Sequence, residues 1–391
     1  MYNSRILIVD DTPENIDVLG NILKDYKKSV ALNGKKAIKI ANEKSPDLIL
    51  LDIMMPGMDG FEVCKILKVN PKTKDIPIIF ITAKNQVEDE TKGLELGAVD
   101  FISKPISPPS VLARVKTHLE LSRSRNELTT KNSKLQELNN HILESLSYAK
   151  LIQKSVLPWE SQIDKLFKDY FILFKPQDIV SGDYYWMQQN DKYSWLAVCD
   201  CTGHGVPGAM LSMIGSKIMD DCILSEQIYD CDLILEKFDK KFSDSLNKSE
   251  NANYLRDTID VCLIRVDKKS KLIQFSGAKR PLLFIKDSEL HEVKGSRKAI
   301  GDYFKNTNSF ESHELDVSEV SYLYLTSDGF PDQNDQFGKK LGSKKFKELL
   351  LSHHNKKSLE QKNTLLGELH NFQKQESQRD DITIIGWNPN E

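Results

Sequence analysis

The stretch between Pro109 and Pro158 contains neither glycine nor proline, and it consists largely of polar residues that favour helices. Apolar residues recur along it at every seventh position: Leu121, Leu128, Leu135, Ile142, Ala149 and Val156. A second apolar seam is interrupted by polar residues. One seam held over several heptads predicts a coiled coil, most simply a parallel homodimer. A single long helix that packs on its own domain is the alternative.

This helical segment divides the 391 residues into a predicted N-terminal domain (1–120), a coiled-coil linker (121–157) and a C-terminal domain (158–391). The length exceeds that of one ordinary domain, so more than one folded unit is expected. Hydrophobic residues make up 39% and charged residues 28% of the chain, which is typical of a soluble globular protein.

Composition and charge disfavour several classes of function. The net charge is −3 and no long basic block occurs, which argues against nucleic acid as the main partner. No apolar run reaches the about 18 residues of a membrane span, so we expect no membrane partner. The N-terminus begins on a strand pattern and not on a signal peptide. Six cysteines without a Cys-x-x-Cys pair predict a reduced, cytoplasmic protein.

Short apolar runs alternate with helical patterns in the N-terminal domain. Residues 5–10, 47–52 and 76–82 form such runs, and amphipathic segments separate them. Continuous apolar strands that alternate with helices predict an α/β fold, a doubly wound parallel sheet covered on both faces. In such sheets the chemistry gathers at the carboxyl ends of the strands.

Polar residues stand at these strand ends. Asp10 and Asp11 follow the first run, Asp52 and Thr82 end two later ones, and Lys104 ends the last. Carboxylates bind Mg²⁺, and the metal together with a lysine can neutralise a phosphoryl group. The sequence therefore predicts a magnesium-dependent phosphoryl site in one crevice.

Residues 4–120 resemble the receiver domain of two-component response regulators, which has a flavodoxin-like fold. The resemblance implies that Asp52 is the phosphoacceptor of a cognate histidine kinase. It implies three aspartates and one main-chain carbonyl as Mg²⁺ ligands: Asp10, Asp11, Asp52 and Met54. It implies three switch residues that respond to the phosphoryl group: Thr82, Phe101 and Lys104. No key position is missing, which disfavours a receiver that is never phosphorylated.

The C-terminal domain shows closely spaced strand patterns of the antiparallel kind. We expect strands over residues 170–174, 183–188, 193–200, 259–266, 272–277, 281–286, 321–327 and 381–387. We expect helices near residues 207–223, 231–247, 343–352 and 358–374. Clusters of strands flanked by long helices predict an α+β sandwich, in which helices cover two sheets.

Four aspartates of this domain lie at predicted strand ends: Asp183, Asp200, Asp328 and Asp380. Turn residues 190–192 lie midway between the first two. A hairpin centred there would place Asp183 opposite Asp200, with their Cβ atoms about 5 Å apart. Two carboxylates so close repel each other unless a cation bridges them. The four aspartates therefore predict a site for a pair of divalent metals.

Residues 148–388 resemble metal-dependent serine/threonine protein phosphatases of type 2C, in particular the bacterial stage II sporulation E-like branch. Four motifs carry the resemblance: Ser181-Gly182-Asp183, Asp200 with Gly203-His204-Gly205, Ser327-Asp328-Gly329 and Arg379-Asp380-Asp381. The resemblance implies a four-layer α-β-β-α sandwich and two Mn²⁺ or Mg²⁺ ions. It implies these metal ligands, with Asp381 as the alternative to Asp380: Asp183, Asp200, the carbonyl of Cys201, Asp328 and Asp380. A metal-activated water would then attack phosphorus in line.

Two residues depart from the pattern of that family. Cys201 follows the bridging aspartate where the family commonly has glycine, but its main-chain carbonyl can still coordinate a metal. His204 lies four residues after that aspartate and not two, so it is a weak candidate for a general acid against a structural role at a helix start. A degenerate, metal-free binding module is the alternative for the whole domain.

Together, the two resemblances predict a response regulator in which phosphorylation of Asp52 controls a metal-dependent phosphoserine or phosphothreonine phosphatase. The stage II sporulation E-like branch implies a phosphorylated anti-sigma-factor antagonist as the substrate. A phosphorylation-gated interaction protein, which binds a sigma-factor regulator without hydrolysis, is the alternative. A DNA-binding output is disfavoured because the chain lacks a helix-turn-helix pattern with a basic recognition face.

Overall fold

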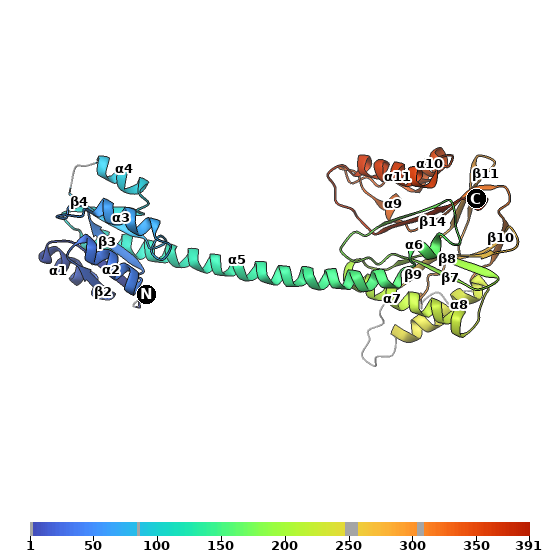
Figure 1. Ribbon diagram of the computed structural model, residues 1–391, viewed down its shortest axis with the longest axis horizontal. Coiled ribbons are helices and arrows are strands. Elements are labelled where there is room, and N and C mark those ends of the chain that lie inside the picture. The colour runs from blue at the N-terminus through green and yellow to red at the C-terminus, as the bar shows by residue number, and fades with distance from the viewer. Residues whose placement is uncertain (1–2, 84–86, 247–256, 303–308) are drawn as a thin grey trace. The chain divides into compact units, whose positions relative to one another are not determined.

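The computed structural model describes residues 3–83, 87–246, 257–302 and 309–391. The chain folds as two compact units, Met1–Asn140 (unit 1) and His141–Glu391 (unit 2) (Figure 1). The boundary between the units falls within one helix, α5, which begins at Pro108 and ends at Val156. Each unit has its own sheets and its own core.

Unit 1 contains a five-stranded parallel sheet with the strand order β2-β1-β3-β4-β5. Its strands are β1 (Arg5–Val9), β2 (Lys27–Ala31), β3 (Leu48–Asp52), β4 (Ile78–Ala83) and β5 (Asp100–Lys104). The helices between them are α1 (Pro13–Ile22), α2 (Gly34–Lys44), α3 (Gly60–Val69) and α4 (Val87–Glu95). One apolar cluster joins the sheet to α2 and α3, and another joins its opposite face to α1 and α5. The predicted doubly wound sheet is confirmed.

Helix α5 changes character along its length. Near its start, Val111, Val115 and Leu119 are buried against the sheet of unit 1. Farther along, the heptad positions Leu128 and Leu135 are 61% and 64% exposed. The predicted linker is therefore helical, and its apolar seam is uncovered in the single chain. Within the described ranges, neither α5 nor any other helix is both long and apolar enough to cross a membrane.

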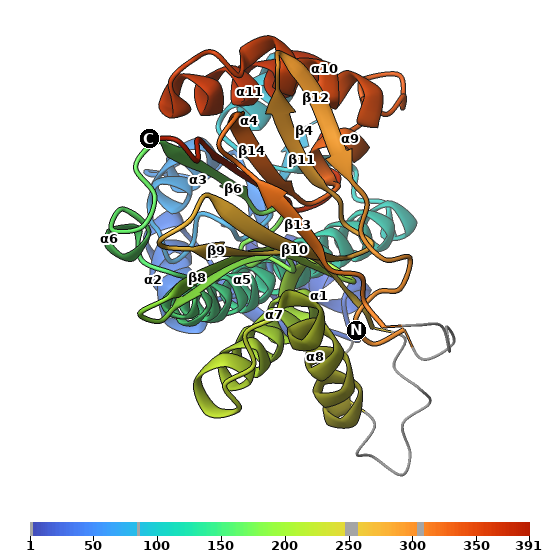
Figure 2. The same ribbon diagram turned by 90° about the vertical axis from the view of Figure 1, so that its right-hand side faces the viewer.

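Unit 2 is a sandwich of two antiparallel sheets between two layers of helices (Figure 2). One sheet has the order β13-β10-β9-β8-β7, and its strands are His313–Asp316, Leu272–Ala278, Ile259–Asp267, Tyr193–Cys201 and Tyr184–Gln189. The other has the order β12-β11-β14-β15-β6, and its strands are Glu289–Val293, Leu282–Lys286, Val320–Thr326, Ile382–Trp387 and Tyr170–Lys175.

The helices of unit 2 cover the outer faces of the two sheets (Figure 2). Helices α7 (Gly205–Asp220) and α8 (Cys231–Leu246) pack on the first sheet, and a short π-helical segment, Asp221–Ser225, follows α7. Helices α9 (Gly329–Asp332), α10 (Ser343–His353) and α11 (Ser358–Gln373) pack on the second. Helix α6 (Glu160–Ile163) and a third apolar cluster lie at the contact of the sheets. The predicted α-β-β-α architecture is confirmed.

Two strands of unit 2, β12 and β13, are missing from the sequence-based prediction. Both lie at the edges of their sheets. Their sequences, Glu-Leu-His-Glu-Val and His-Glu-Leu-Asp, are rich in charged residues and only half-buried or exposed. Edge strands tolerate such residues because only one side pairs with a neighbour. The apolar alternation that identifies an inner strand is therefore absent.

Strands β7 and β8 form the predicted hairpin. Tyr184 pairs with Cys199, and the same register places Asp183 opposite Asp200. The side-chain oxygen of Asn190 accepts hydrogen bonds from two backbone N–H groups of the turn. The turn residues therefore fix the register that brings the first two aspartates of the predicted metal site together.

Candidate phosphoryl and metal sites

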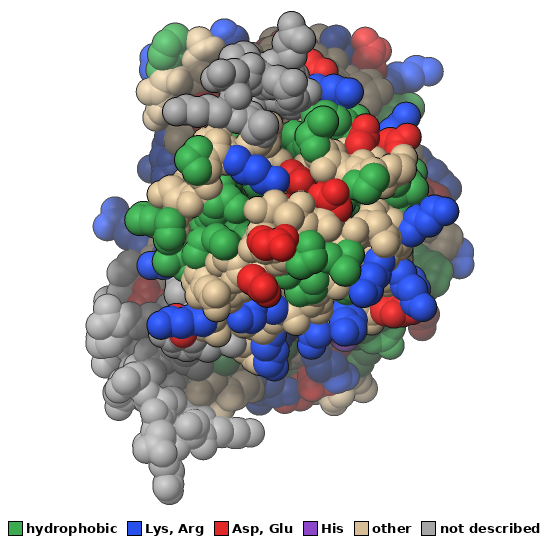
Figure 3. Space-filling view, turned by 90° about the vertical axis from the view of Figure 1, so that its left-hand side faces the viewer, with side chains coloured by type: hydrophobic (Ala, Val, Ile, Leu, Met, Phe, Trp, Pro, Cys, Tyr) green, Lys and Arg blue, Asp and Glu red, His purple; other side chains and the backbone are tan. Residues whose placement is uncertain are grey.

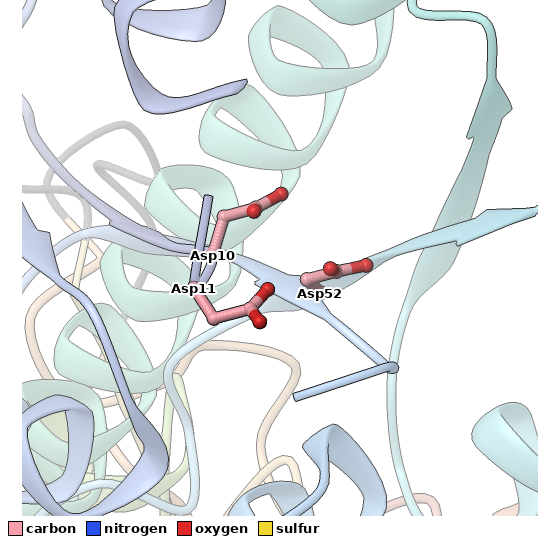
Figure 4. Close-up of side chains that lie close together, drawn as sticks. All are labelled: Asp10, Asp11 and Asp52. Carbon is pink, nitrogen blue, oxygen red and sulfur yellow. The ribbon is translucent and has the colours of Figure 1, made fainter. Parts of the chain in front are cut away.

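Three carboxylates of unit 1 meet at the carboxyl ends of β1 and β3. Asp10, Asp11 and Asp52 each offer an oxygen within 4.8 Å of the others, and their side chains lie close together (Figure 4). In the described part of the chain this is the one group of three or more potential ligands that close together. Acidic side chains gather near the middle of the face in Figure 3, with lysine and arginine mostly toward its edge. The arrangement suits a divalent cation.

Lys104 faces these carboxylates from the end of β5. Its Nζ lies 3.1 Å from Asp52 and 3.4 Å from Asp10. Asp10 is held in place because one of its oxygens also accepts hydrogen bonds from the Thr12 N–H and the Asn15 amide. Burial raises the pKa of Asp52, and the hydrogen bond and charge of Lys104 oppose that shift. Asp52 thus sits between a lysine and two carboxylates, as an acceptor of a phosphoryl group requires.

The remaining receiver residues lie where the strand ends predict them. Thr82 is buried in β4, one strand away from Asp52 in β3. Phe101 is half-buried in β5, and the Arg114 guanidinium lies 5.6 Å from the centre of its ring. Met54 follows β3, and its side chain is largely exposed, so only its main chain can serve the crevice.

In unit 2, Asp183 and Asp381 meet across the two sheets. Asp183 directly precedes β7 and is buried, and its Oδ2 atom has no hydrogen-bond partner among the described residues. Asp381 precedes β15 in the other sheet, and its two oxygens accept hydrogen bonds from the N–H groups of Gln177 and Gly182, at 2.7 and 2.6 Å. Asp381 therefore holds the loop that carries Asp183, while Asp183 itself is free to bind a cation.

A second link between the sheets runs through Arg280, which lies between β10 and β11. Its Nη2 atom is 2.8 Å from Asp200 in β8 and 2.6 Å from Asp328, which follows β14. The same atom is 3.2 Å from Asp260, the residue of β9 that pairs with Asp200. One guanidinium thus links Asp200 and Asp328, two of the four predicted aspartates, with Asp260.

The pKa values of four aspartates in unit 2 are shifted by burial and by neighbouring charges. Burial raises the pKa of Asp183 to about 7, and it raises the pKa of Asp200 well above its ordinary value, with the Asp183 charge adding to the effect. The pKa of Asp328 is lowered, because the charge and hydrogen bond of Arg280 outweigh its burial. Burial also raises the pKa of Asp380. Positive charge beyond that of the Arg280 guanidinium would stabilise the ionised forms of these aspartates.

Main-chain packing completes the site. Gly203 has a φ of 85°, which glycine adopts most readily. A Cβ atom on Gly182 would lie 2.5 Å from the Gly203 oxygen and 3.2 Å from the Cys201 oxygen, so only glycine fits. The carbonyl of Cys201 therefore faces the loop that carries Asp183. Burial raises the pKa of the Cys201 thiol well above its ordinary value, so the carbonyl is the better candidate ligand.

His204 lies at the start of α7 on the rim of the site. Its Nδ1 atom is 2.9 Å from Asp178, and both side chains are more than half exposed. The hydrogen bond with Asp178 raises the pKa of His204. The pair joins the loop before β7 to the start of α7, which fits the structural role of His204 weighed above.

Three residues of the site were missed from the sequence: Asp178, Asp260 and Arg280. Asp260 is the second residue of the expected strand 259–266, and Asp183 is the first residue of the expected strand 183–188. This similar position at a strand start was the available signal for Asp260. Arg280 is followed by Pro281, which marks a turn, but nothing in the local sequence indicates that its side chain reaches two other strands.

Comparison with known proteins follows the same division of the chain. Residues 6–116 match the response regulator receiver domain, and residues 190–388, half of the chain, match stage II sporulation protein E (SpoIIE). The chain belongs to the stage II sporulation protein E family. It combines a domain of this family with a receiver domain.

Two curated relatives illustrate its similarity to other proteins. The chain is 47% identical over 132 residues to the "Probable cyclic di-GMP phosphodiesterase" of Vibrio cholerae, covering 34% of this chain and 30% of the relative. It is 46% identical over 117 residues to the response regulator PleD of Caulobacter vibrioides, covering 29% and 26%. The chain thus spans less than a third of the length of these relatives.

Among solved structures, the SiaA-PP2C domain of Pseudomonas aeruginosa is similar to this chain. The two are 33% identical with a TM-score of 0.58, and the likeness covers 64% of this chain and 98% of that domain. This likeness supports a PP2C-like fold for the C-terminal part of the chain.

Proposed function

We propose that this chain is a response regulator whose output is a metal-dependent phosphoserine/phosphothreonine protein phosphatase. The observation that carries the proposal is the buried, unpaired Asp183 oxygen opposite Asp200 at an edge where carboxylates from both sheets meet. A buried carboxylate oxygen without a hydrogen bond is costly, and a bound divalent cation would remove that cost. The SpoIIE match and the likeness to the SiaA-PP2C domain support the same activity.

These donors fit two Mn²⁺ or Mg²⁺ ions. The residues that would hold the ions are Asp183, Asp200, the Cys201 carbonyl, Asp328 and Asp380. The oxygens of Asp381 accept hydrogen bonds from main-chain N–H groups. We therefore assign Asp381 to holding the loop, and not to binding a metal. Bound ions would neutralise charge and supply a water nucleophile activated at neutral pH. The protein's part is to hold these oxygens in place and to orient the phosphoryl group.

In the receiver, Asp10, Asp11 and Asp52 with the Met54 carbonyl would hold Mg²⁺. A cognate histidine kinase would then phosphorylate Asp52. Lys104 already contacts the accepting carboxylate at 3.1 Å, which supports its role as the partner of a phosphoryl oxygen. Thr82 and Phe101 would respond to the modification, as they do in the family that the sequence resembles.

Gln153 supplies a connection between the linker helix and the metal site of unit 2. It is buried near the end of α5, and its amide donates to the Ser181 carbonyl and to the Ser212 hydroxyl. Its oxygen accepts from the Ser181 N–H, at 3.1 Å. Ser181 is two residues before Asp183, so a shift of α5 would move that ligand directly. A homodimer through the exposed heptad seam would convert a rearrangement of the receivers into such a shift.

The proposed substrate is a phosphorylated anti-sigma-factor antagonist, which is supported by membership of the SpoIIE family. All six cysteines are free and buried, which supports a reducing, cytoplasmic location.

The test of the activity is Mn²⁺-dependent hydrolysis of a phosphoserine protein by the full-length chain. Asp200→Asn should lower the rate by at least about a hundredfold, since it removes a metal ligand. Full activity of that variant would refute the assignment of the site. Mn²⁺ binding without hydrolysis of any phosphoprotein or of p-nitrophenyl phosphate would instead favour the interaction protein.

A further inference from the structure

One arginine, Arg280, reaches into the acidic cluster of unit 2, and the Nζ atom of Lys279 lies 3.3 Å from Asp260 beside it. One atom, Arg280 Nη2, is 2.8 Å from Asp200, 2.6 Å from Asp328 and 3.2 Å from Asp260. The Arg280 side chain is 14% exposed, and its Nε atom is buried without a hydrogen-bond partner among the described residues. The guanidinium therefore satisfies three carboxylates with one nitrogen and leaves part of its own donor set unused.

The backbone fixes where this side chain starts. Lys279 has a φ of 58°, and the Arg280 N–H donates to the Ala278 carbonyl at 2.8 Å, which closes a rare and strained three-residue turn. A Cβ atom on Gly277 or Gly295 would lie 2.2 or 2.5 Å from the Arg280 oxygen. The main chain at Arg280 is thus clamped between two glycines, so a change of position is left to the side chain.

Arg280 and a divalent cation placed between Asp200 and Asp328 would compete for the same oxygens. Mn²⁺ or Mg²⁺ binds carboxylate oxygens at about 2.0–2.2 Å. An ion so close to the Oδ2 atoms of Asp200 and Asp328 would occupy the space that Nη2 takes at 2.8 and 2.6 Å.

Displacement would leave a planar cation at the rim of the metal site with no carboxylate to neutralise it. The anion that arrives there is the phosphoryl group of the substrate. Guanidinium is the side chain that matches phosphate best, because its fork donates two parallel hydrogen bonds. Resting on the proposed function, we propose that Arg280 binds the phosphoryl group of the substrate, and that the same guanidinium takes the place of a metal among Asp200, Asp260 and Asp328 before the ions bind.

The experiment compares wild type with Arg280→Gln, Arg280→Lys and a matched control, Arg265→Gln. Arg265 has the same 14% exposure and pairs with one carboxylate, Asp230, at 2.6 Å, but lies outside the site. The first readout is the affinity of the metal-free, full-length protein for Mn²⁺. It is measured from the electron paramagnetic resonance signal of unbound Mn²⁺. The receiver site contributes equally to all four proteins, so differences report on unit 2.

We expect Arg280→Gln to bind Mn²⁺ about tenfold more tightly than wild type, because a competing charge about 3 Å from the ligands is removed. Arg280→Lys keeps that charge and should bind Mn²⁺ as wild type does. The second readout is binding of inorganic phosphate to the Mn²⁺-saturated proteins by calorimetry. Both Arg280 variants should bind phosphate at least about tenfold more weakly, because neither has the bidentate fork.

Each result decides one point. If Arg280→Gln binds Mn²⁺ and phosphate with the same affinities as the Arg265→Gln control, the inference is overturned. The proposed function would then stay intact. A wild-type unit 2 that binds no Mn²⁺ would overturn the proposed function first. If Arg280→Gln does not fold, Arg280→Lys decides, because wild-type phosphate affinity in that variant also contradicts the inference.

Discussion

Asp183→Asn should stabilise the metal-free protein while it abolishes metal binding. Burial raises the pKa of Asp183 from 3.8 to about 7. The unfolded chain thus loses this proton from about pH 4 upward, whereas the folded protein keeps it until about pH 7. The contribution of this group to stability is fully present below about pH 4 and is lost as the pH rises through about 7. Asparagine is neutral at every pH, so it keeps that contribution.

The size of the effect follows from the shift. Each tenfold change in proton affinity is worth about 1.4 kcal/mol, and a rise from 3.8 to about 7 is roughly three such steps, or on the order of 4 kcal/mol. We expect metal-free Asp183→Asn to exceed wild type by about 2–4 kcal/mol at pH 8 and to match it near pH 4. Mn²⁺ at a thousand times its Kd should reverse the order, since it adds about 4.1 kcal/mol to wild type alone.

The assay is urea unfolding followed by tryptophan fluorescence in the presence and absence of a chelator. All four tryptophans lie in unit 2, so the signal reports on that unit within the full-length chain. Asp328→Asn is the control, because Arg280 lowers the pKa of Asp328 and the same chemical change should therefore destabilise the metal-free protein at pH 8. An Asp183→Asn protein that is no more stable than wild type at pH 8 without metal would refute the reasoning.

Three further outcomes are expected. Gln153→Leu should cost about 2–4 kcal/mol and weaken Mn²⁺ binding in unit 2, because it leaves the Ser181 backbone unpaired; calorimetry against Lys154→Ala, an exposed neighbour, checks this. Asp381→Asn should destabilise the metal-free protein through lost backbone hydrogen bonds, whereas Asp380→Asn should lower Mn²⁺ affinity without destabilising the metal-free protein, because burial raises the pKa of Asp380; equal destabilisation by both changes would contradict these roles. Replacing both Leu135 and Ile142 by asparagine should weaken self-association at least about tenfold in analytical ultracentrifugation, and a wild-type monomer at all concentrations would exclude the coiled-coil dimer.

Much of the fold could be predicted because the sequence is locally consistent. The apolar runs of β1, β3 and β4 carry their own strand signal, and the turn residues between β7 and β8 fix the register that places Asp183 opposite Asp200. The acidic ends of these strands then identify both sites. The charged strands β12 and β13 carry no such signal, because each lies at the edge of its sheet and pairs on one side only among the described strands.

The parts of the site that escaped prediction depend on contacts between the sheets. Asp380 and Asp381 look alike in sequence, and only the hydrogen bonds from Gln177 and Gly182 distinguish the one that holds a loop. Arg280 likewise acquires its role from three carboxylates on three other segments. Such long-range arrangements depend on how the two sheets pack together. Local sequence patterns carry no information about that packing.

The central claim is that the phosphoryl site of the receiver controls the metal site of the phosphatase. Its most direct test is the rate of Mn²⁺-dependent phosphoprotein hydrolysis with and without beryllofluoride, a phosphoryl mimic, in wild type and in Asp52→Asn. A coupling of about 1–3 kcal/mol predicts a change of about fivefold or more in wild type and none in the variant. A wild-type rate that stays the same while the mimic is bound at Asp52 would contradict the account.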